Sequence, residues 1–239
     1  MPYQTPFITD GIYHIYNRGT RKGRIFQSPN DHKRWHELIY WCKTYNYPYS
    51  TYLQRTERAE NQEHPKKDIL NKLNTSYRLE KAPVEILANV ELDNHFHLLI
   101  RQTQDRGISK FMSRLQTSFS KYFNTLYSFK GPVFEGMYKA LQVLTDEYLL
   151  QLIRYIHLNP LAAKLVDKNT LLSYPWSSLP TYMNKEKKIY LSTDYCLGMF
   201  DNNKKQFWKF IIDSVEQNSI DTLQGITHDD DFNWYSSSF

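Results

Sequence analysis

One short stretch constrains the fold more than the rest of the chain: Val90-Glu-Leu-Asp-Asn-His-Phe-His-Leu-Leu-Ile100. Two apolar runs flank an Asp-Asn pair, and both of these residue types favour tight turns, so the stretch predicts a β-hairpin. Successive strand side chains point to opposite faces, which places His95 and His97 together on one face and Phe96 on the other. Two imidazoles in this arrangement can hold one divalent ion, although such a pair also occurs as hydrogen-bonded structure.

Strands and helices alternate along the remainder of the chain. Strands are predicted where β-branched and aromatic residues gather, and helices where apolar residues recur at helical spacing behind a capping residue. This order predicts an α+β domain, with an antiparallel sheet and helices packed on one face. The predicted strands are 11–18, 84–92, 95–102 and 138–144, and the predicted helices are 28–43, 109–127 and 145–159.

The segment between the first helix and the hairpin is less regular. Its aromatic run is expected to be extended or to pair as a strand, its charged run to form an exposed loop, and its last part to form a short helix. These three parts are residues 45–53, 55–67 and 68–73. We interpret 54–83 as an insertion in a catalytic domain that spans 1–182. Residues 183–239 are predicted to be a mostly helical C-terminal appendage with an acidic tail.

Charge and cysteine usage limit the classes of partner and compartment. The formal net charge is +5, and residues 101–139 hold seven basic and two acidic side chains, whereas residues 213–239 hold six acidic side chains and no Lys or Arg. A basic body of this kind suits a polyanion. The two cysteines, Cys42 and Cys196, are far apart, which argues for a reducing compartment and against a thiolate metal site. No signal peptide and no membrane span are predicted, so we expect a cytoplasmic protein.

Basic residues gather in two places that suit a sugar-phosphate backbone. The helix 109–127 has an apolar side and, opposite it, a basic stripe without acids, and residues 18–24 form a basic loop that contains glycine. A solvated surface is the alternative for both. The residues predicted to contact DNA are Arg18, Arg21, Lys22, Arg24, Lys110, Arg114, Lys121 and Lys139.

The helix 145–159 carries Tyr155 and Asn159 one turn apart, so both lie on one side of it. If this helix packs across the sheet, Asn159 can join His95 and His97 in an open three-ligand site for Mg or Mn. The phenol of Tyr155, whose ordinary pKa is about 10, then becomes a candidate nucleophile that needs a base or the metal for its activation. Tyr122 is the rival tyrosine, but its helical position predicts core packing.

Four motifs occur in order along the chain: Asn94-His-Phe-His-Leu-Leu, Gly131-Pro-x-Phe-x-Gly-x-Tyr-Lys139, Arg154-Tyr-Ile-His-Leu-Asn-Pro160 and Tyr174-Pro-Trp-Ser-Ser178. Together they resemble the single-tyrosine HUH transposases, in particular the REP-associated tyrosine transposases of the IS200/IS605-like group. The resemblance covers roughly residues 11–182. It implies a ferredoxin-like sheet and a single-stranded DNA substrate that carries a hairpin.

The resemblance also implies roles for individual residues. His95 and His97 match the metal-binding pair, Tyr155 the nucleophile and Asn159 the third ligand. The chain is therefore expected to nick and transfer single-stranded DNA through a 5′-phosphotyrosine, beside REP-type hairpins, as a monomer or homodimer at a bacterial-type nucleoid. A domesticated, non-cleaving binder of hairpin DNA or RNA is the main alternative. A metal hydrolase of small phosphoesters is disfavoured by the basic helix.

Overall fold

A four-stranded antiparallel sheet forms the centre of the protein in the computed structural model, which describes residues 7–58 and 65–216. Its strands are β1 (Ile12–Arg18), β2 (Val84–Leu92), β3 (His95–Gln102) and β4 (Lys139–Val143), in the order β2-β3-β1-β4. Helix α1 (Pro29–Thr44) lies between β1 and β2, and α4 (Gly107–Leu126) between β3 and β4. This βαββαβ order is ferredoxin-like, so the predicted α+β fold class is confirmed.

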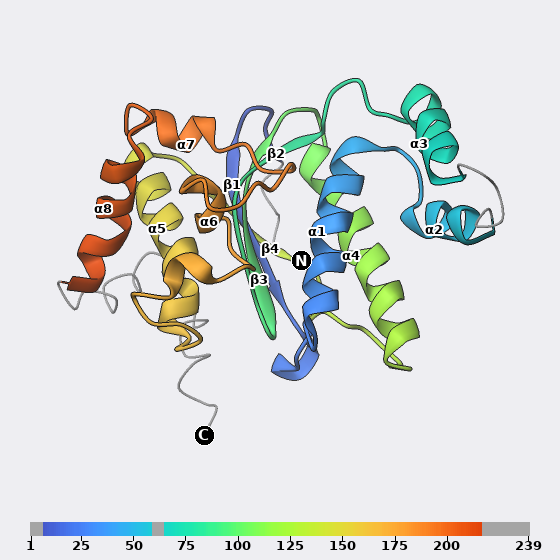
Figure 1. The fold of residues 1–239 in the computed structure, drawn as a ribbon, viewed down its shortest axis with the longest axis horizontal. Coiled ribbons are helices and arrows are strands. Elements are labelled where there is room, and N and C mark those ends of the chain that lie inside the picture. Colours follow the sequence, from blue (N-terminus) through green and yellow to red (C-terminus); the bar gives the residue numbers. More distant parts are fainter. Residues whose placement is uncertain (1–6, 59–64, 217–239) are drawn as a thin grey trace.

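Helices cover both faces of this sheet, which corrects the expectation of helices on one face (Figure 1). Helices α1 and α4 pack on the face that carries Phe96, Leu98 and Ile100. Helix α5 (Asp146–Ala162) packs on the opposite face, against β2 and β3. The physical reason is that β2 and β3 carry apolar side chains on both faces, and burying both requires two helical layers.

Local sequence explains where the main elements begin. The hairpin turns at residues 93–94, with Leu92 opposite His95. At the start of α1, the carboxylate of Asp31 accepts hydrogen bonds from the backbone N–H groups of Gln27 and Ser28, both 2.8 Å long. At the start of α5, the hydroxyl of Thr145 accepts the N–H of Tyr148 at 3.1 Å. These contacts stabilise the first turns of α1 and α5, so the predicted starts of these two helices are confirmed. Helix α4 begins at Gly107, two residues before its predicted start.

The segment after α1 is more helical than its sequence indicates. Helices α2 (Tyr49–Arg58) and α3 (Pro65–Ser76) occupy most of it, so the expected loop over 55–67 is wrong in its described part. Strand pairing in the aromatic run is limited to an isolated bridge between Tyr45 and Arg78. The aromatic side chains of this run pack on Trp41 near the end of α1 instead of alternating across a sheet.

The chain after α5 completes the second layer and one sheet edge. Helices α6 (Leu179–Tyr182), α7 (Asp194–Gly198) and α8 (Lys204–Glu216) follow it, with short 3-10 turns at Thr20–Lys22 and Leu171–Ser173. Figure 1 shows α6, α7 and α8 on the same side of the sheet as α5, and the side chains of Phe207 and Ile211 share its core. The domain boundary at 182/183 stays a prediction, and the acidic tail from 217 onward lies outside the described residues.

Residues 174–178 line the outer edge of β2. Ser177 forms an antiparallel bridge with Val90, and the N–H of Glu91 donates to the carbonyl oxygen of Trp176 at 2.9 Å. The Tyr-Pro-Trp-Ser-Ser motif therefore satisfies backbone groups that an edge strand would leave open. Over the described part of the chain, no helix combines the length and the apolarity needed to cross a bilayer.

Candidate active site

The packing of α5 on the sheet brings the predicted tyrosine to the predicted histidines. The Oη of Tyr155 lies 3.5 Å from Nε2 of His97, and the two ring centroids are 5.2 Å apart. The rings of His95 and His97 are also 5.2 Å apart and nearly perpendicular. A separation of 3.5 Å is longer than a typical hydrogen bond but leaves the phenol oxygen beside the imidazole of His97.

Asn159 is buried one helical turn after Tyr155. Side chains four residues apart lie on the same side of a helix, so its amide belongs to the side of α5 that carries Tyr155. Among the described residues, no three His, Cys, Asp or Glu side chains come close enough to hold a metal together. The ligand set of two imidazoles and an amide oxygen stays a prediction.

A third histidine, His14 on β1, belongs to this site and was missed by the sequence interpretation. Its Nε2 lies 2.9 Å from Nδ1 of His97, and its side chain is fully buried. The ring also lies 6.1 Å from that of Tyr155. The available signal was strand alternation, which places His14 on the same face of β1 as Tyr16, but only strand order shows that β1 lies beside β3.

Burial keeps this histidine pair neutral. Desolvation lowers the pKa of His14 from 6.5 to about 3. The pKa of His97 is lowered well below the usual value by burial and, secondarily, by the neighbouring imidazoles of His14 and His95. At neutral pH each of the two rings therefore carries one proton and one lone pair, and a neutral imidazole is the form that can bind a metal or accept a proton.

The rival tyrosine and the remaining histidine of α5 lie apart from this arrangement. Tyr122 is on α4, which packs on the other face of the sheet, and its hydroxyl donates to Oδ1 of Asp31 at 2.8 Å. Burial and this bond raise its pKa, which disfavours the phenolate. His157 is bonded to Oγ of Ser178 at 2.7 Å. Tyr122 and His157 therefore form hydrogen bonds with residues outside the candidate site.

The sheet face that carries His14, His95 and His97 is called the histidine face below. Several of the predicted DNA contacts lie at its edge. Arg18 stands opposite His95 in the β1–β3 register and forms an ion pair with Glu135. Lys139 stands opposite Tyr16, with its Nζ 5.6 Å from the centroid of that ring. The loop that follows β1 holds the exposed side chains of Arg21, Lys22 and Arg24, and Arg24 is paired with Asp93 at 2.6 Å.

The predicted stripe on α4 needs one correction. Lys110 and Lys121 are exposed, but Arg114 is half-buried. Its guanidinium donates to the backbone oxygens of Cys42 at 3.1 Å and Tyr45 at 2.5 Å, at the C-terminal end of α1. Helix ends leave carbonyl groups unpaired and carry partial negative charge, so Arg114 joins α4 to the end of α1 instead of facing solvent.

We expect Arg114→Gln to lower the free energy of unfolding by about 1–3 kcal/mol, because the carbonyl groups that it binds lose a charged donor. Lys110→Gln, a matched loss of charge at an exposed position of the same helix, should change it by less than about 0.5 kcal/mol. Urea unfolding of both variants provides the measurement. Equal stability of the two variants would show that the bonds of Arg114 contribute nothing to the fold.

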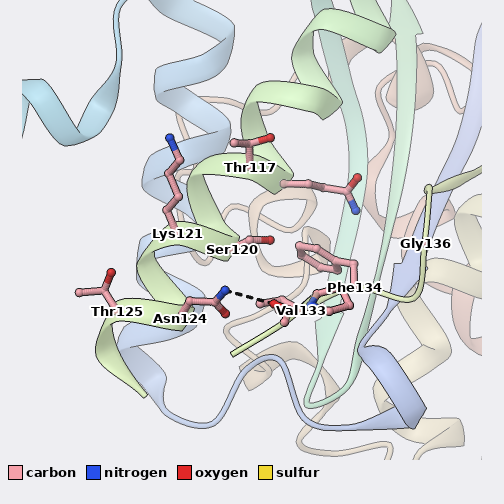
Figure 2. A pocket seen from close by; sticks show the side chains of 11 residues that line it. Thr117, Ser120, Lys121, Asn124, Thr125, Val133, Phe134 and Gly136 are labelled. Atoms are coloured by element: carbon pink, nitrogen blue, oxygen red, sulfur yellow. Dashed lines mark hydrogen bonds between the residues drawn. The ribbon is translucent and has the colours of Figure 1, made fainter. Parts of the chain in front are cut away.

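A pocket of about 640 Å³ lies between α4 and the loop that leads to β4. Figure 2 shows Ser120 and Asn124 on the helix turned toward Val133 and Phe134 of the loop, with Lys121 beside them. The amide nitrogen of Asn124 donates to the carbonyl oxygen of Gly131 at 3.2 Å, which ties the loop to α4. The same loop contains Glu135, which forms an ion pair with Arg18 at the edge of the histidine face. One loop therefore borders both the pocket and the histidine face.

The chain is similar to known proteins in two comparisons. Residues 43–159 match the family described as "Transposase IS200 like". A solved structure described as "Structure of the REP associates tyrosine transposase bound to a REP hairpin" is 13% identical, covers 77% of this chain and 86% of its own, and has a TM-score of 0.48. The search of curated proteins found no match.

The matched residues contain the hairpin with both histidines, all of α4, and α5 as far as Tyr155 and Asn159. They leave out β1 and everything that follows α5. Residues 43–159, just under half of the chain, are therefore similar to the family of IS200-like transposases.

Proposed function

We propose that this protein nicks single-stranded DNA and transfers the cut strand through a covalent bond to Tyr155. One observation carries the proposal: the phenol oxygen of Tyr155 lies 3.5 Å from Nε2 of His97, on the sheet face that also carries His95. Tyr122, by contrast, is engaged with Asp31 on the opposite face. A nucleophile has to lie beside the groups that activate it, and this condition supports Tyr155.

The proposed reaction transfers the phosphate at the cleaved bond to Tyr155. The Tyr155 oxygen loses its proton and attacks the phosphorus, the bond from phosphorus to the 3′ oxygen breaks, and that oxygen takes up a proton. The products are a 5′-phosphotyrosine and a free 3′ hydroxyl. Attack by another 3′ hydroxyl reverses the step, so the phosphodiester energy is kept and no nucleotide cofactor is required.

The residues present fit a divalent ion such as Mg or Mn. His95, His97 and Asn159 would hold it, because neutral imidazoles and an amide oxygen are suitable ligands and His97 is kept neutral by burial. The bond from His97 Nδ1 to a second buried group is also typical of a histidine that binds metal through its other nitrogen. When bound, the ion polarises the scissile phosphate and favours the phenolate.

The proposed substrate is a single strand that carries a hairpin of the REP type. The support is the order of the four motifs along the chain and the basic side chains that border the histidine face. Arg18 and Lys139 lie on strand β1 and at the start of β4 beside the site, and the exposed Arg21 and Lys22 extend the basic border. Side chains at these places suit phosphate groups on either side of the cleaved bond.

The decisive experiment uses a hairpin oligonucleotide labelled at its 3′ end, because the proposed intermediate joins the protein to the 5′ phosphate of the downstream strand. Incubation with Mn²⁺ and separation on a denaturing gel should show a labelled band at the mass of the protein plus DNA. EDTA should remove that band. Hairpin binding without a covalent band, at any divalent ion tested, would instead assign the chain as a non-cleaving hairpin binder.

The exposed lysines of α4 provide a separate test of DNA binding. We expect the double variant Lys110→Gln, Lys121→Gln to reduce the slope of log affinity against log salt by about 0.7 per lost contact on single strands, or about 0.9 on a duplex stem. The reason is that each lysine that neutralises a phosphate releases condensed counterions. Affinity should fall about equally for different hairpin sequences, because phosphate contacts carry no sequence information.

The matched control removes two exposed lysines of α8, Lys205 and Lys209, which lie on the other side of the sheet (Figure 1). This variant has the same net charge as the α4 variant. If both variants change the salt slope equally, the effect is that of overall charge, and α4 is not a DNA-binding face.

A further inference from the structure

His14 lies outside the residues that match the transposase family, yet it touches the centre of the proposed site. In the β1–β3 register it stands opposite Leu99, while Tyr16 stands opposite His97, so the two histidines are diagonal neighbours on one face. Diagonal neighbours are far enough apart that only long or aromatic side chains meet. Here the ring nitrogens approach to 2.9 Å, in a hydrogen bond between two fully or almost fully buried rings.

The bond between the two rings contains one proton, and its position decides what His97 can do. If His14 donates from Nε2, the proton of the neutral His97 ring is on its own Nε2 and points toward Tyr155. If His97 donates from Nδ1, its Nε2 carries a lone pair on the side of Tyr155. Only the second arrangement leaves a nitrogen able to bind a metal beside the nucleophile, since a protonated nitrogen has no lone pair to offer.

We propose that His14 is a positioning residue, which accepts the Nδ1–H of His97 and thereby holds the Nε2 lone pair of His97 toward Tyr155 and the metal. This inference rests on the metal-binding role proposed above for His97. It assigns a role to a residue of β1 that neither the family match nor the sequence motifs include. Partners of this kind fix the ring orientation and tautomer of a metal-binding histidine and raise its basicity.

The surroundings of His14 fix the orientation of its ring. Its ring stacks on Tyr16 at 4.8 Å and on His97 at 5.1 Å, so its orientation is fixed by packing. Its Nδ1 is buried and has no hydrogen-bond partner among the described residues. Acceptance at Nε2 places the proton of the neutral ring on this unpaired Nδ1, which costs stability. Packing, and not a second hydrogen bond, therefore holds the ring in the position where its Nε2 meets Nδ1 of His97.

Two variants separate this role from simple core packing. His14→Phe keeps a planar ring but removes the acceptor, so the Nδ1–H of His97 is left buried and unpaired. His14→Gln places an amide oxygen near the former Nε2 position and restores an acceptor. We expect His14→Phe to weaken binding of Mn²⁺ by about 10- to 100-fold, and His14→Gln to recover most of that loss. Calorimetric titration of the full chain with Mn²⁺ alone gives these affinities without reference to DNA cleavage.

His157→Gln is the matched control. His157 is also fully buried, bonded through Nε2, and without a partner at Nδ1 among the described residues, but it binds Ser178 instead of a site residue. Its replacement should leave Mn²⁺ affinity unchanged. Equal Mn²⁺ affinity in wild type and His14→Phe would overturn the proposal. Equal losses of Mn²⁺ affinity in His14→Phe and His157→Gln would also overturn it, because disturbed packing would then explain both.

Nitrogen-15 NMR of the wild-type protein without metal tests the tautomer directly, even if His14→Phe fails to fold. The expected spectrum shows the proton of His97 on Nδ1 and an unprotonated Nε2. A proton on Nε2 of His97 would overturn the proposal. Absence of Mn²⁺ binding in the wild type would instead reject the metal role in the proposed function, and the NMR assignment would still decide whether His14 accepts from His97.

Discussion

Replacing Tyr155 with phenylalanine is expected to abolish the covalent protein–DNA band and to lower cleavage by at least about 10⁴-fold. The substitution removes only the oxygen that attacks the phosphorus, and the ring keeps its packing against the α5 side of the core. Binding of the hairpin should stay within about twofold of wild type, because basic surfaces and not the phenol supply most of the affinity. The 3′-labelled oligonucleotide and a filter-binding assay measure the two quantities in parallel.

Tyr122→Phe is the control for this result. It removes a phenol oxygen on the other face of the sheet, where the lost bond to Asp31 should cost about 0.5–1.5 kcal/mol of stability but leave cleavage intact. Activities are compared at a temperature at which both variants are folded. Persistence of the adduct in Tyr155→Phe, together with its loss in Tyr122→Phe, would mean that the nucleophile has been assigned to the wrong tyrosine.

Acid is expected to destabilise the protein from about pH 6.5 downward, well before ordinary carboxylates titrate. Burial lowers the pKa of His157 from 6.5 to about 3 and is the largest influence on His32, whose pKa falls from 6.5 to about 4. The unfolded chain therefore binds a proton at each of these residues below pH 6.5, while the folded chain does not. Protonation stabilises the unfolded state, so the free energy of unfolding falls as pH is lowered from 6.5 toward the folded-state pKa.

Each fully depressed histidine contributes up to about 1.4 kcal/mol of lost stability per pH unit in this window. Urea unfolding at pH 7.0, 6.0 and 5.0 measures the slope. In His157→Gln the side chain at this position is neutral in both states. The slope of the unfolding free energy against pH, between pH 6 and 5, should therefore fall by the equivalent of about one bound proton. An unchanged slope would show that His157 is protonated in the folded protein, in conflict with its buried position.

Carboxylates affect the free energy of unfolding in a lower pH range than the buried histidines do. Burial is the largest single influence on Glu91 and would raise its pKa, but His36, Lys188 and His32 together outweigh burial and lower the pKa from 4.5. The stability that this depressed carboxylate supplies is present above its unfolded pKa and is lost only as pH falls below about 4.5. The slope between pH 6 and 5 therefore reports on the buried histidines.

The sequence by itself determined the elements that depend on near neighbours in the chain. Alternation around the Asp-Asn turn predicted the hairpin and placed His95 and His97 on one face. A capping hydroxyl at Thr145 and helical spacing placed Tyr155 and Asn159 on one side of α5. These patterns are reliable because strand and helix geometry relate residues two or four positions apart in a fixed way. The motifs then connected the same residues to the transposase family.

Tertiary structure decided the features that depend on contacts between distant segments. His14 and His97 are 83 residues apart, and Arg114 lies 72 residues from Cys42, so no local pattern predicted either contact. The composition of the aromatic run after α1 is typical of a strand. In the structure, Tyr49 and Tyr52 belong to a helix, because their rings pack on the ring of Trp41. Side-chain packing of this kind overrides local propensity, because burial of one large aromatic ring contributes more free energy than the preference of any single residue for strand or helix.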